Sequence, residues 1–318
     1  MISMMDQLLF SASITGPIFL MLALGVILKR VGLINENFIE VASKLVFQVT
    51  LPAMLFLSIV GSEHNFAAGS AFVGYGLIAN ILFFFFTTLS ARLFFKHSND
   101  KGVIIQGGFR ANTAIIALAY VANAYGDEGV ALAAVYVAAT TVLYNIQAVI
   151  ALSPKGQDSK SQATKVIVKT LTKNPLIIAI LLGVAVYWLS LPIPDMVVDA
   201  GQYFANMTLP LALLCTGGSL DVRALRHEQG PSWFATSYKL MIGPILITLG
   251  AYLFGFRGIE LGILFFMNAA PTAAASYVMA RSMGGNARLA ANIIALTTVL
   301  SVFSCTLGIF VLTNLSLM

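Results

Sequence analysis

The sequence predicts an all-α integral membrane protein with ten transmembrane helices, arranged as two inverted repeats of five helices. Three observations lead to this fold class: the composition, a series of long apolar segments joined by connections of alternating charge, and short motifs that recur in the second half. Hydrophobic residues make up 58% of the chain and charged residues only 10%, whereas soluble domains carry roughly 25% charged residues. A mean hydropathy of +0.89 fits a chain that is largely embedded in a bilayer.

Ten apolar segments follow one another along the chain, each close to the length of about 20 residues that a helix needs to cross the hydrocarbon core. They cover residues 11–28, 38–60, 67–95, 103–125, 129–152, 175–191, 196–220, 233–254, 259–281 and 289–312. Pro52 predicts a kink in the second segment. Between the fifth and sixth segments, residues 153–163 form a polar linker, and the short basic segment 164–173 is expected on the membrane surface. The predicted units are therefore a first repeat (1–152), a linker region (153–173) and a second repeat (174–318).

Lysine and arginine residues gather in every other connection between these segments. The odd-numbered connections hold 14 of the 18 Lys and Arg residues, whereas the even-numbered connections and the two termini hold only Arg257. Cation-rich connections face the cytoplasm under the positive-inside rule. We therefore expect the linker region on the cytoplasmic side and both termini outside. The remaining cations, Lys44, Arg110 and Lys239, lie within segments.

Five short motifs recur in the same order in both halves, at offsets of 157–159 residues. The proline-containing pair GP at 16–17 recurs as NP at 174–175, and TLP at 50–52 recurs as TLP at 208–210. Because the repeating unit holds five segments, an odd number, the second unit enters the membrane from the opposite side, and the repeat is inverted.

The fourth and ninth segments contain residues that a bilayer disfavours. Residues 107–120 read GGFRANTAIIALAY, and residues 265–280 read FFMNAAPTAAASYVMA. Non-helical backbone is tolerated at membrane depth only where it is buried in protein or lines a cavity. Matching interruptions in the two halves of a chain indicate the substrate site of a secondary transporter. We therefore expect both segments to be broken and the two breaks to meet near the membrane midplane.

Arg110 is the sharpest candidate for substrate binding. An intramembrane guanidinium should face the bundle interior or water, and it can bind a carboxylate through two parallel hydrogen bonds. The alternative is a structural arginine that snorkels or caps carbonyl groups of the broken helix. The other polar candidates either bind substrate or replace backbone hydrogen bonds lost at the breaks and kinks. They are Asn112, Thr113, Asn268, Pro271 and Thr272 at the breaks, and Gln48, Thr50, Asn206 and Thr208 beside Pro52 and Pro210.

Other polar residues within the segments are assigned to packing or to the membrane surface. Lys44 and Lys239 are expected to extend their long side chains to the headgroups. Tyr144, Asn145 and Gln147 are assigned to hydrogen bonds between helices. Asp and Glu residues occur only near segment ends, which argues against a dedicated cation antiporter because a buried carboxylate is the usual carrier of the coupling ion.

The remaining chemistry-bearing residues give no sign of catalysis. The three histidines lie far apart in connections, and both cysteines fall inside apolar segments, so we expect no metal site and no disulfide. The sequence shows no phosphate-binding loop, dinucleotide motif or nucleophile motif. We therefore expect no enzyme activity, no cofactor and no nucleic-acid partner. The expected partners are a small organic anion and the lipid bilayer, and a homodimer remains open.

Four long stretches and one tripeptide carry a family resemblance. They are residues 16–34 (GPIFLMLALGVILKRVGLI), 50–52 (TLP), 174–184 (NPLIIAILLGV), 208–220 (TLPLALLCTGGSL) and 268–286 (NAAPTAAASYVMARSMGGN). Through them the chain resembles the auxin efflux carrier family over essentially its whole length. The resemblance implies the ten-helix fold of sodium/proton antiporters and bile acid symporters, in which the broken fourth helices of the two repeats cross at the substrate site. Members often carry a proline in the fourth segment, but this chain has none there, so its break is expected to rest on Gly107, Gly108 and Asn112.

The resemblance also bears on function, since the family includes plant auxin exporters and bacterial carriers assigned to malonate, malate and related organic acids. The expected function is a secondary carrier that moves a small organic carboxylate across the inner (plasma) membrane by alternating access. The main alternative is a sodium-coupled symporter of the bile acid type on the same fold. A non-transporting membrane sensor is a third hypothesis, disfavoured because no connection is long enough to form a signalling domain.

Overall fold

The computed structural model describes residues 4–61, 70–153, 172–220 and 229–318, and these residues form helices without a β-strand. The first half contains α1 (Met4–Arg30), α2 (Glu36–Leu45), the π-helical turn η1 (Val46–Thr50), α3 (Leu51–Val60), α4 (Ser70–Phe94), α5 (Lys101–Phe109), the π-helical turn η2 (Thr113–Ala117) and α6 (Leu118–Leu152). The second half contains α8 (Pro175–Trp188), α9 (Asp195–Ser219), α10 (Gln229–Ser237), the π-helical turn η4 (Tyr238–Ile242), α11 (Gly243–Leu253), α12 (Gly258–Ala269), α13 (Ala275–Ser282) and α14 (Ala287–Asn314). Most of the predicted linker and basic segment, together with His64 and His227, lies outside the described residues.

Helices occupy all ten predicted segments, and the protein is a multi-pass membrane protein. Among the described residues, six continuous helical stretches are long and apolar enough to span a membrane. The shorter α8 and α12 are also apolar. The first half of α9 carries Asp195, Asp199, Gln202 and Asn206, which explains why this long helix is less apolar than the others.

A sharp turn and an expected kink within the helices follow from local backbone chemistry. The fourth and fifth segments join in α6, but the chain turns sharply at Gly126, where φ is 60° and ψ is −152°. A positive φ of this kind is readily adopted only by glycine. At the expected kink in the second segment, the π-helical turn η1 comes directly before Pro52, and the Leu51 N–H donates to the Val46 carbonyl five residues back. This wider turn accommodates a proline, which has no N–H to donate, within a continuous helical stretch.

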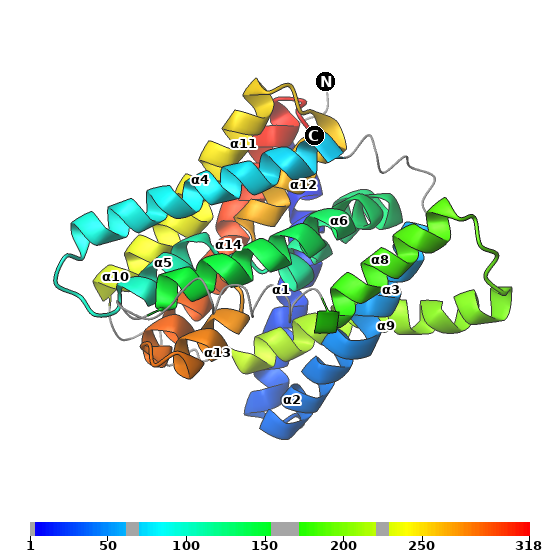
Figure 1. The fold of residues 1–318 in the computed structure, drawn as a ribbon, viewed down its shortest axis with the longest axis horizontal. Helices are drawn as coiled ribbons and strands as arrows, with labels where there is room; N and C mark the ends of the chain where they lie inside the picture. The colour runs from blue at the N-terminus through cyan, green and yellow to red at the C-terminus, as the bar shows by residue number, and fades with distance from the viewer. Residues whose placement is uncertain (1–3, 62–69, 154–171, 221–228) are drawn as a thin grey trace.

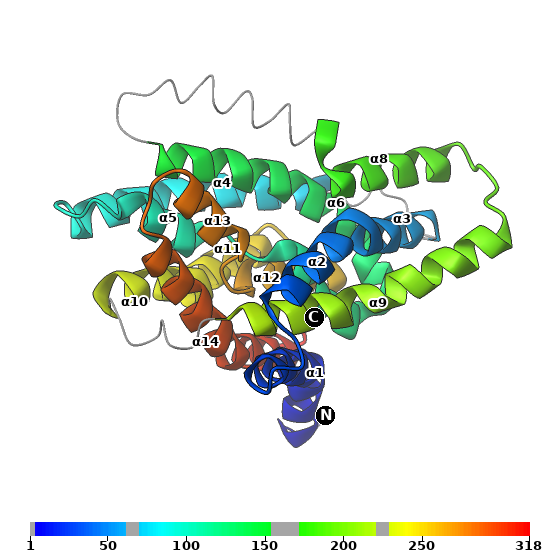
Figure 2. The same ribbon diagram turned by 90° about the horizontal axis from the view of Figure 1, so that it is seen from below.

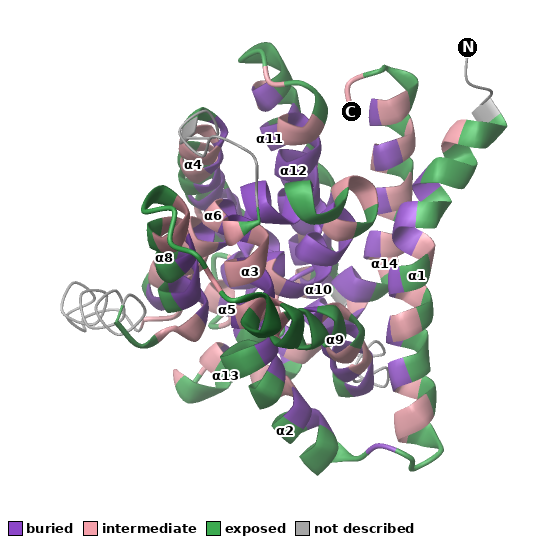
Figure 3. Ribbon diagram, turned by 90° about the vertical axis from the view of Figure 1, so that its right-hand side faces the viewer, coloured by how far each residue is buried: buried purple, intermediate pink, exposed green. Residues whose placement is uncertain are grey.

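The helices form two groups on either side of α6 (Figure 1). One group, here called the end group, consists of α2, η1, α3, α8 and α9, which contact one another. At the other end lie α4, α5, α10 and α11, while α12 and α14 occupy the middle, and α1 packs on both α9 and α14 (Figures 1 and 2). Buried residues gather in the interior around α12 (Figure 3), where every residue from Leu261 to Ala269 is buried. Large apolar side chains such as Leu20, Phe94 and Phe303 are exposed on the outside, as a lipid-facing surface requires.

Two helix pairs within this arrangement approach closely at glycine. A methyl group on Gly25 of α1 would lie 2.8 Å from the Gly218 amide nitrogen of α9, and closer still to the Leu214 carbonyl oxygen. In the second half, a methyl group on Gly183 of α8 would lie 3.3 Å from the Phe56 carbonyl oxygen of α3. The α1–α9 contact at Gly25 is therefore between backbones, whereas the α8–α3 contact at Gly183 also involves the Ile59 side chain, whose Cβ would lie 3.3 Å away.

Candidate functional site

The fourth and ninth segments are both broken, as the sequence predicts. In the fourth, α5 ends at Phe109 and the helix resumes at Thr113. In the ninth, α12 ends at Ala269 and α13 begins at Ala275. The two non-helical stretches thus each expose backbone groups that a continuous helix would have satisfied.

The two breaks meet and pair with each other. Ala111 and Thr272 form an isolated antiparallel bridge. The Asn112 N–H donates to the Pro271 carbonyl at 2.8 Å, and the Ala273 N–H donates to the Arg110 carbonyl at 3.2 Å. This short two-stranded contact replaces helical hydrogen bonds in both segments, so each break stabilises the other.

Two glycines expected to cause the first break have a different role. Gly107 and Gly108 lie inside α5 and are buried. A methyl group on Gly107 would lie 2.8 Å from the Ile293 side chain, and one on Gly108 would lie 3.0 Å from the Thr87 side chain. They permit close helix packing, whereas the break itself begins at Arg110, whose backbone is extended (φ −78°, ψ 106°).

Buried hydrogen bonds satisfy backbone groups at the second break and in the last turn of α5. Lys239 of η4 donates its Nζ to the Asn268 carbonyl at 2.6 Å, and the Cys305 Sγ lies 3.4 Å from the Ala269 carbonyl. The Thr272 Oγ1 donates to the Gly107 carbonyl of α5 at 2.7 Å, and the Thr272 N–H donates to the Thr297 Oγ1 at 3.1 Å. A cation at the C-terminal end of a helix is favourable because that end carries partial negative charge.

The position of Lys239 corrects the sequence-based interpretation. We expected its side chain to reach the headgroups, but it is 2% exposed and lies against the end of α12. The carbonyl groups released at the break offer a buried hydrogen-bond partner that the sequence of η4 alone does not reveal. Lys44 follows the expectation more closely, since it is exposed and pairs with Glu40 at 2.7 Å.

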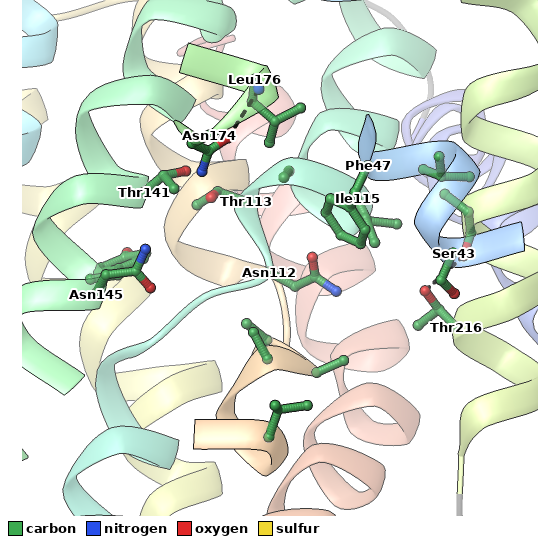
Figure 4. A pocket seen from close by; sticks show the side chains of 18 of the residues that line it. Ser43, Phe47, Asn112, Thr113, Ile115, Thr141, Asn145, Asn174, Leu176 and Thr216 are labelled. Carbon is green, nitrogen blue, oxygen red and sulfur yellow. Dashed lines mark hydrogen bonds between the residues drawn. The ribbon is translucent and has the colours of Figure 1, made fainter. Parts of the chain in front are cut away.

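A cavity of about 770 Å³ lies between the end group and the crossing of the two breaks. Figure 4 shows Thr141 and Asn145 of α6 on one side, Ser43 and Thr216 on the other, and Asn112 between them. The polar or charged residues that line it are Ser43, Gln48, Arg110, Asn112, Thr113, Thr141, Tyr144, Asn145, Lys173, Asn174, Thr216 and Ser219. Ala273 and Ala274, which precede α13, and Ala275, its first residue, complete the wall beside the second break.

Four of the ten predicted site residues line this cavity: Arg110, Asn112, Thr113 and Gln48. The other six do not. Asn268, Pro271 and Thr272 are buried in the crossing, where their polar groups are bonded to protein. Thr50 and Thr208 are fully buried beside the prolines, and Asn206 is exposed and accepts from Gln202 at 2.9 Å.

Arg110 is a buried cation held by two uncharged acceptors. Its side chain lies on the cavity wall and is 7% exposed. The Nη2 donates to the Asn145 Oδ1 at 2.8 Å, and the Nη1 donates to the Met279 sulfur at 2.6 Å. The ion pairs that join two described residues are Lys29–Glu36 and Lys44–Glu40, so no carboxylate within this part of the chain neutralises Arg110.

Two helix N-termini add to the positive potential at the cavity. The helical stretch that starts at Thr113 and continues as α6, and the helix α13, both begin at its wall. The first N–H groups of a helix lack partners within the helix, and that end carries partial positive charge. Together with Arg110, these two ends make the cavity suited to an anion.

Some residues of the site escaped the sequence analysis. Thr141 and Asn145 stand one helical turn apart on the same face of α6, which is a spacing the sequence does show. Asn145 faces the cavity rather than only joining helices. Tyr144 and Gln147 do join helices, since they donate to the Asn80 side chain at 2.9 Å and to its carbonyl at 3.3 Å.

No group of three or more His, Cys, Asp or Glu side chains comes together among the described residues. Cys215 lines the cavity and Cys305 is buried at the second break, and both are free thiols. The cavity wall thus combines apolar side chains such as Phe47, Ile115 and Leu176 with amides, hydroxyls, one arginine and one lysine.

Comparisons with known proteins give this site a context. The family described as membrane transport protein, to which the auxin efflux carriers belong, matches residues 15–309. The chain is 22% identical over 302 residues to an uncharacterized transporter of Methanothermobacter thermautotrophicus, covering 93% of this chain and 96% of that protein. It is 23% identical over 313 residues to the uncharacterized transporter MJ1031 of Methanocaldococcus jannaschii, covering 93% and 97% of the two chains.

Proposed function

Because the chain belongs to the membrane transport protein family, the family of the auxin efflux carriers, we propose that it is a secondary carrier for a small organic carboxylate. It moves this anion across the plasma (inner) membrane by alternating access. Membership of a transporter family also speaks against an enzyme. The observation that carries the proposal is Arg110, a buried guanidinium that no described carboxylate neutralises, on the wall of a cavity at the crossing of two broken helices.

The chemistry of the cavity favours a carboxylate substrate. A buried charge without a counter-charge costs free energy, and a bound anion would offset that cost. An arginine fork matches the two oxygens of a carboxylate, and the two helix N-termini at the wall attract the same charge. Neutral side chains such as Asn112 and Thr113 can complete the hydrogen bonds of such an anion.

Helix packing supports the inverted repeat on which alternating access depends. Under the repeat, α1 corresponds to α8, and α9 corresponds to the helices α2 and α3. The α1–α9 contact at Gly25 and the α8–α3 contact at Gly183 are then equivalent, and both are close glycine contacts. In the proposed mechanism, the end group moves relative to the helices that cross at the two breaks. The cavity between them is thereby exposed to each side of the membrane in turn.

The topology expected from the charge pattern indicates to which side of the membrane the cavity opens. The cavity reaches Lys173 and Ser219, which lie at helix ends expected on the cytoplasmic side. We infer that the state described here faces inward. A cysteine placed at Gln157 should then react with an impermeant reagent only from the cytoplasm, and one placed at Asn65 only from outside. Labelling of the Gln157 variant in intact cells would overturn the proposed topology.

Uptake by the purified protein in proteoliposomes tests the function directly. A panel of labelled mono- and dicarboxylates, including malonate and malate, is offered with and without a sodium gradient. The proposal expects saturable uptake of at least one carboxylate by wild-type protein and none by empty liposomes. Uptake that requires sodium would favour the bile acid type of symporter, and no uptake or binding of any carboxylate would refute the proposed function.

A further inference from the structure

Asn145 is the only described residue whose side-chain oxygen accepts a hydrogen bond from Arg110. It lies on α6 within the part of the helix that forms the cavity wall. Thr141, one turn earlier on the same wall, donates its hydroxyl to the Val137 carbonyl at 2.7 Å instead. The position that fixes the guanidinium is therefore occupied by a neutral amide.

The second acceptor of Arg110 is much weaker. A thioether sulfur such as that of Met279 is a poor hydrogen-bond acceptor. Met279 also belongs to α13, an eight-residue helix after the second break, whereas Asn145 belongs to the long helix α6. A carboxylate oxygen that enters the cavity can replace the sulfur at Nη1 while the Nη2 stays on Asn145.

The amide of Asn145 has a second useful group. Its Nδ2 has no acceptor among the residues that the structure describes, although its Oδ1 is engaged by Arg110. An amide presents both a donor and an acceptor. The same side chain can therefore hold Arg110 through its oxygen and donate to the bound anion through its nitrogen.

From this arrangement we infer that Asn145 sets the charge selectivity of the cavity. Its neutral oxygen positions the guanidinium without neutralising it, so that the positive charge remains for a carboxylate from solution. An acid at this position would form an internal ion pair and exclude the anion. The inference rests on the proposed function, because it assumes that the substrate of the cavity is an anion.

Asn145→Asp tests this inference with almost no change in shape. Binding of the carboxylate panel to purified protein is measured by calorimetry at pH 7, together with the melting temperature. We expect Asn145→Asp to weaken anion binding at least about 100-fold, the size typical of compensating a buried charge, while the melting temperature rises or stays unchanged. Damage to the fold would instead lower both quantities. Asn145→Ala should weaken binding only about 3- to 10-fold, the effect of one neutral hydrogen bond.

A matched control and a second readout separate the possible failures. Asn314→Asp makes the same substitution at an exposed position near the end of α14, outside the cavity, and should leave binding unchanged. Phenylglyoxal, a guanidinium reagent, should label Arg110 in wild-type protein without any substrate, and Asn145→Asp should protect it. If wild type binds carboxylates and Asn145→Asp binds them equally well, the inference is overturned and the proposed function stands. If wild type binds none of the panel, the proposed function fails first, and the charge selectivity fails with it.

Discussion

The two breaks lie at matching positions in the sequences of the two halves, but their polar side chains point in different directions. The first break, around Arg110 and Asn112, turns its polar side chains toward the cavity. The second break, around Pro271, turns the side chains of Asn268 and Thr272 into the protein, where they bond to neighbouring helices. Interruptions that match in the sequence therefore differ in the structure, since one has its polar side chains at the cavity and the other has them bonded in the interior.

This difference shows how one break can face the cavity without a proline. The fourth segment has no proline in its interruption, and the ninth segment satisfies its free backbone groups. The Asn112 N–H donates to the Pro271 carbonyl, and the Arg110 carbonyl accepts from the Ala273 N–H. The second break can supply this support because Lys239, Cys305 and Thr297 satisfy its own polar groups from the other side. Substitutions on the two sides should therefore separate substrate affinity from stability.

Among substitutions at the two breaks, the largest expected effect is the loss of anion affinity in Arg110→Ala. Losing a charge-assisted contact should weaken binding by about 1.5–3 kcal/mol, roughly one to two decades in affinity. Thermal stability should stay unchanged or rise, because a buried unpaired cation is removed. Arg110→Lys should recover part of the affinity, since an ammonium keeps the charge but not the fork.

Calorimetry with the carboxylate panel and a melting curve measure this prediction. Arg257→Ala is the control, because Arg257 is exposed and contacts Tyr252 away from the cavity. A monodisperse Arg110→Ala protein with wild-type affinity would end the anion-binding role of Arg110. The role would then pass to Asn112 and to the two helix N-termini.

Thr272→Val should show the opposite pattern on the side of the second break. It keeps the shape of the side chain but leaves the Gly107 carbonyl without its donor inside the crossing. We expect a loss of about 1–3 kcal/mol of stability, the cost of an unsatisfied buried group, and an anion affinity close to that of wild type. Melting temperature and calorimetry are measured on the same preparation. A drop in affinity at unchanged stability would place Thr272 in the binding site after all.

A matched pair of asparagines sharpens the comparison further. Asn112 lines the cavity, whereas Asn268 donates to the Leu264 carbonyl at 2.8 Å in the interior. Asn112→Ala should weaken anion binding by about 1 kcal/mol with little change in melting temperature. Asn268→Ala should lower stability by a similar amount and spare the affinity. Equal behaviour of the two variants in both assays would contradict the separation of anion binding at the first break from stability at the second.

The smallest effect is expected for Pro271→Ala. Pairing of the two breaks, rather than the proline ring, holds the ninth segment open, just as it holds open the fourth segment without a proline. The cost should be about 0.4–1 kcal/mol, the usual consequence of a freer unfolded chain. Melting temperature measures this cost, and unchanged accessibility of a cysteine at Ala274 shows that the break persists. A large loss of stability, or burial of that position, would show that the proline makes the break.

The sequence predicted the breaks but not the orientation of their side chains. Gly107, Asn112 and Pro271 within apolar segments are unusual enough to mark the interruptions. Which of these residues face the cavity depends on how the segments cross, and that is set by pairs such as Asn112 with Pro271 that lie far apart in the chain. Thr272 therefore looked like a candidate for substrate binding as strong as Thr113.

Arg110 and Asn145 show the same limit of sequence analysis, because only one member of this hydrogen-bonded pair is conspicuous in the sequence. An arginine in an apolar segment is costly and therefore conspicuous, so its place at the cavity was predicted. An asparagine in a helix is common, and nothing in the local sequence links it to an arginine 35 residues away. Lys239 was misplaced for a related reason, since its partner is a backbone carbonyl freed by the break in another helix.

The contact between α1 and α9 has a consequence for the cavity wall. At Gly25 the two backbones come so close that an added methyl group would overlap the Leu214 carbonyl oxygen and lie 2.8 Å from the Gly218 amide nitrogen. Even the side chain of alanine therefore does not fit at this point unless the two helices move apart. Because α9 also carries Thr216 and Ser219 of the cavity wall, the position of that wall depends on a glycine in a helix that itself contributes no residue to the cavity.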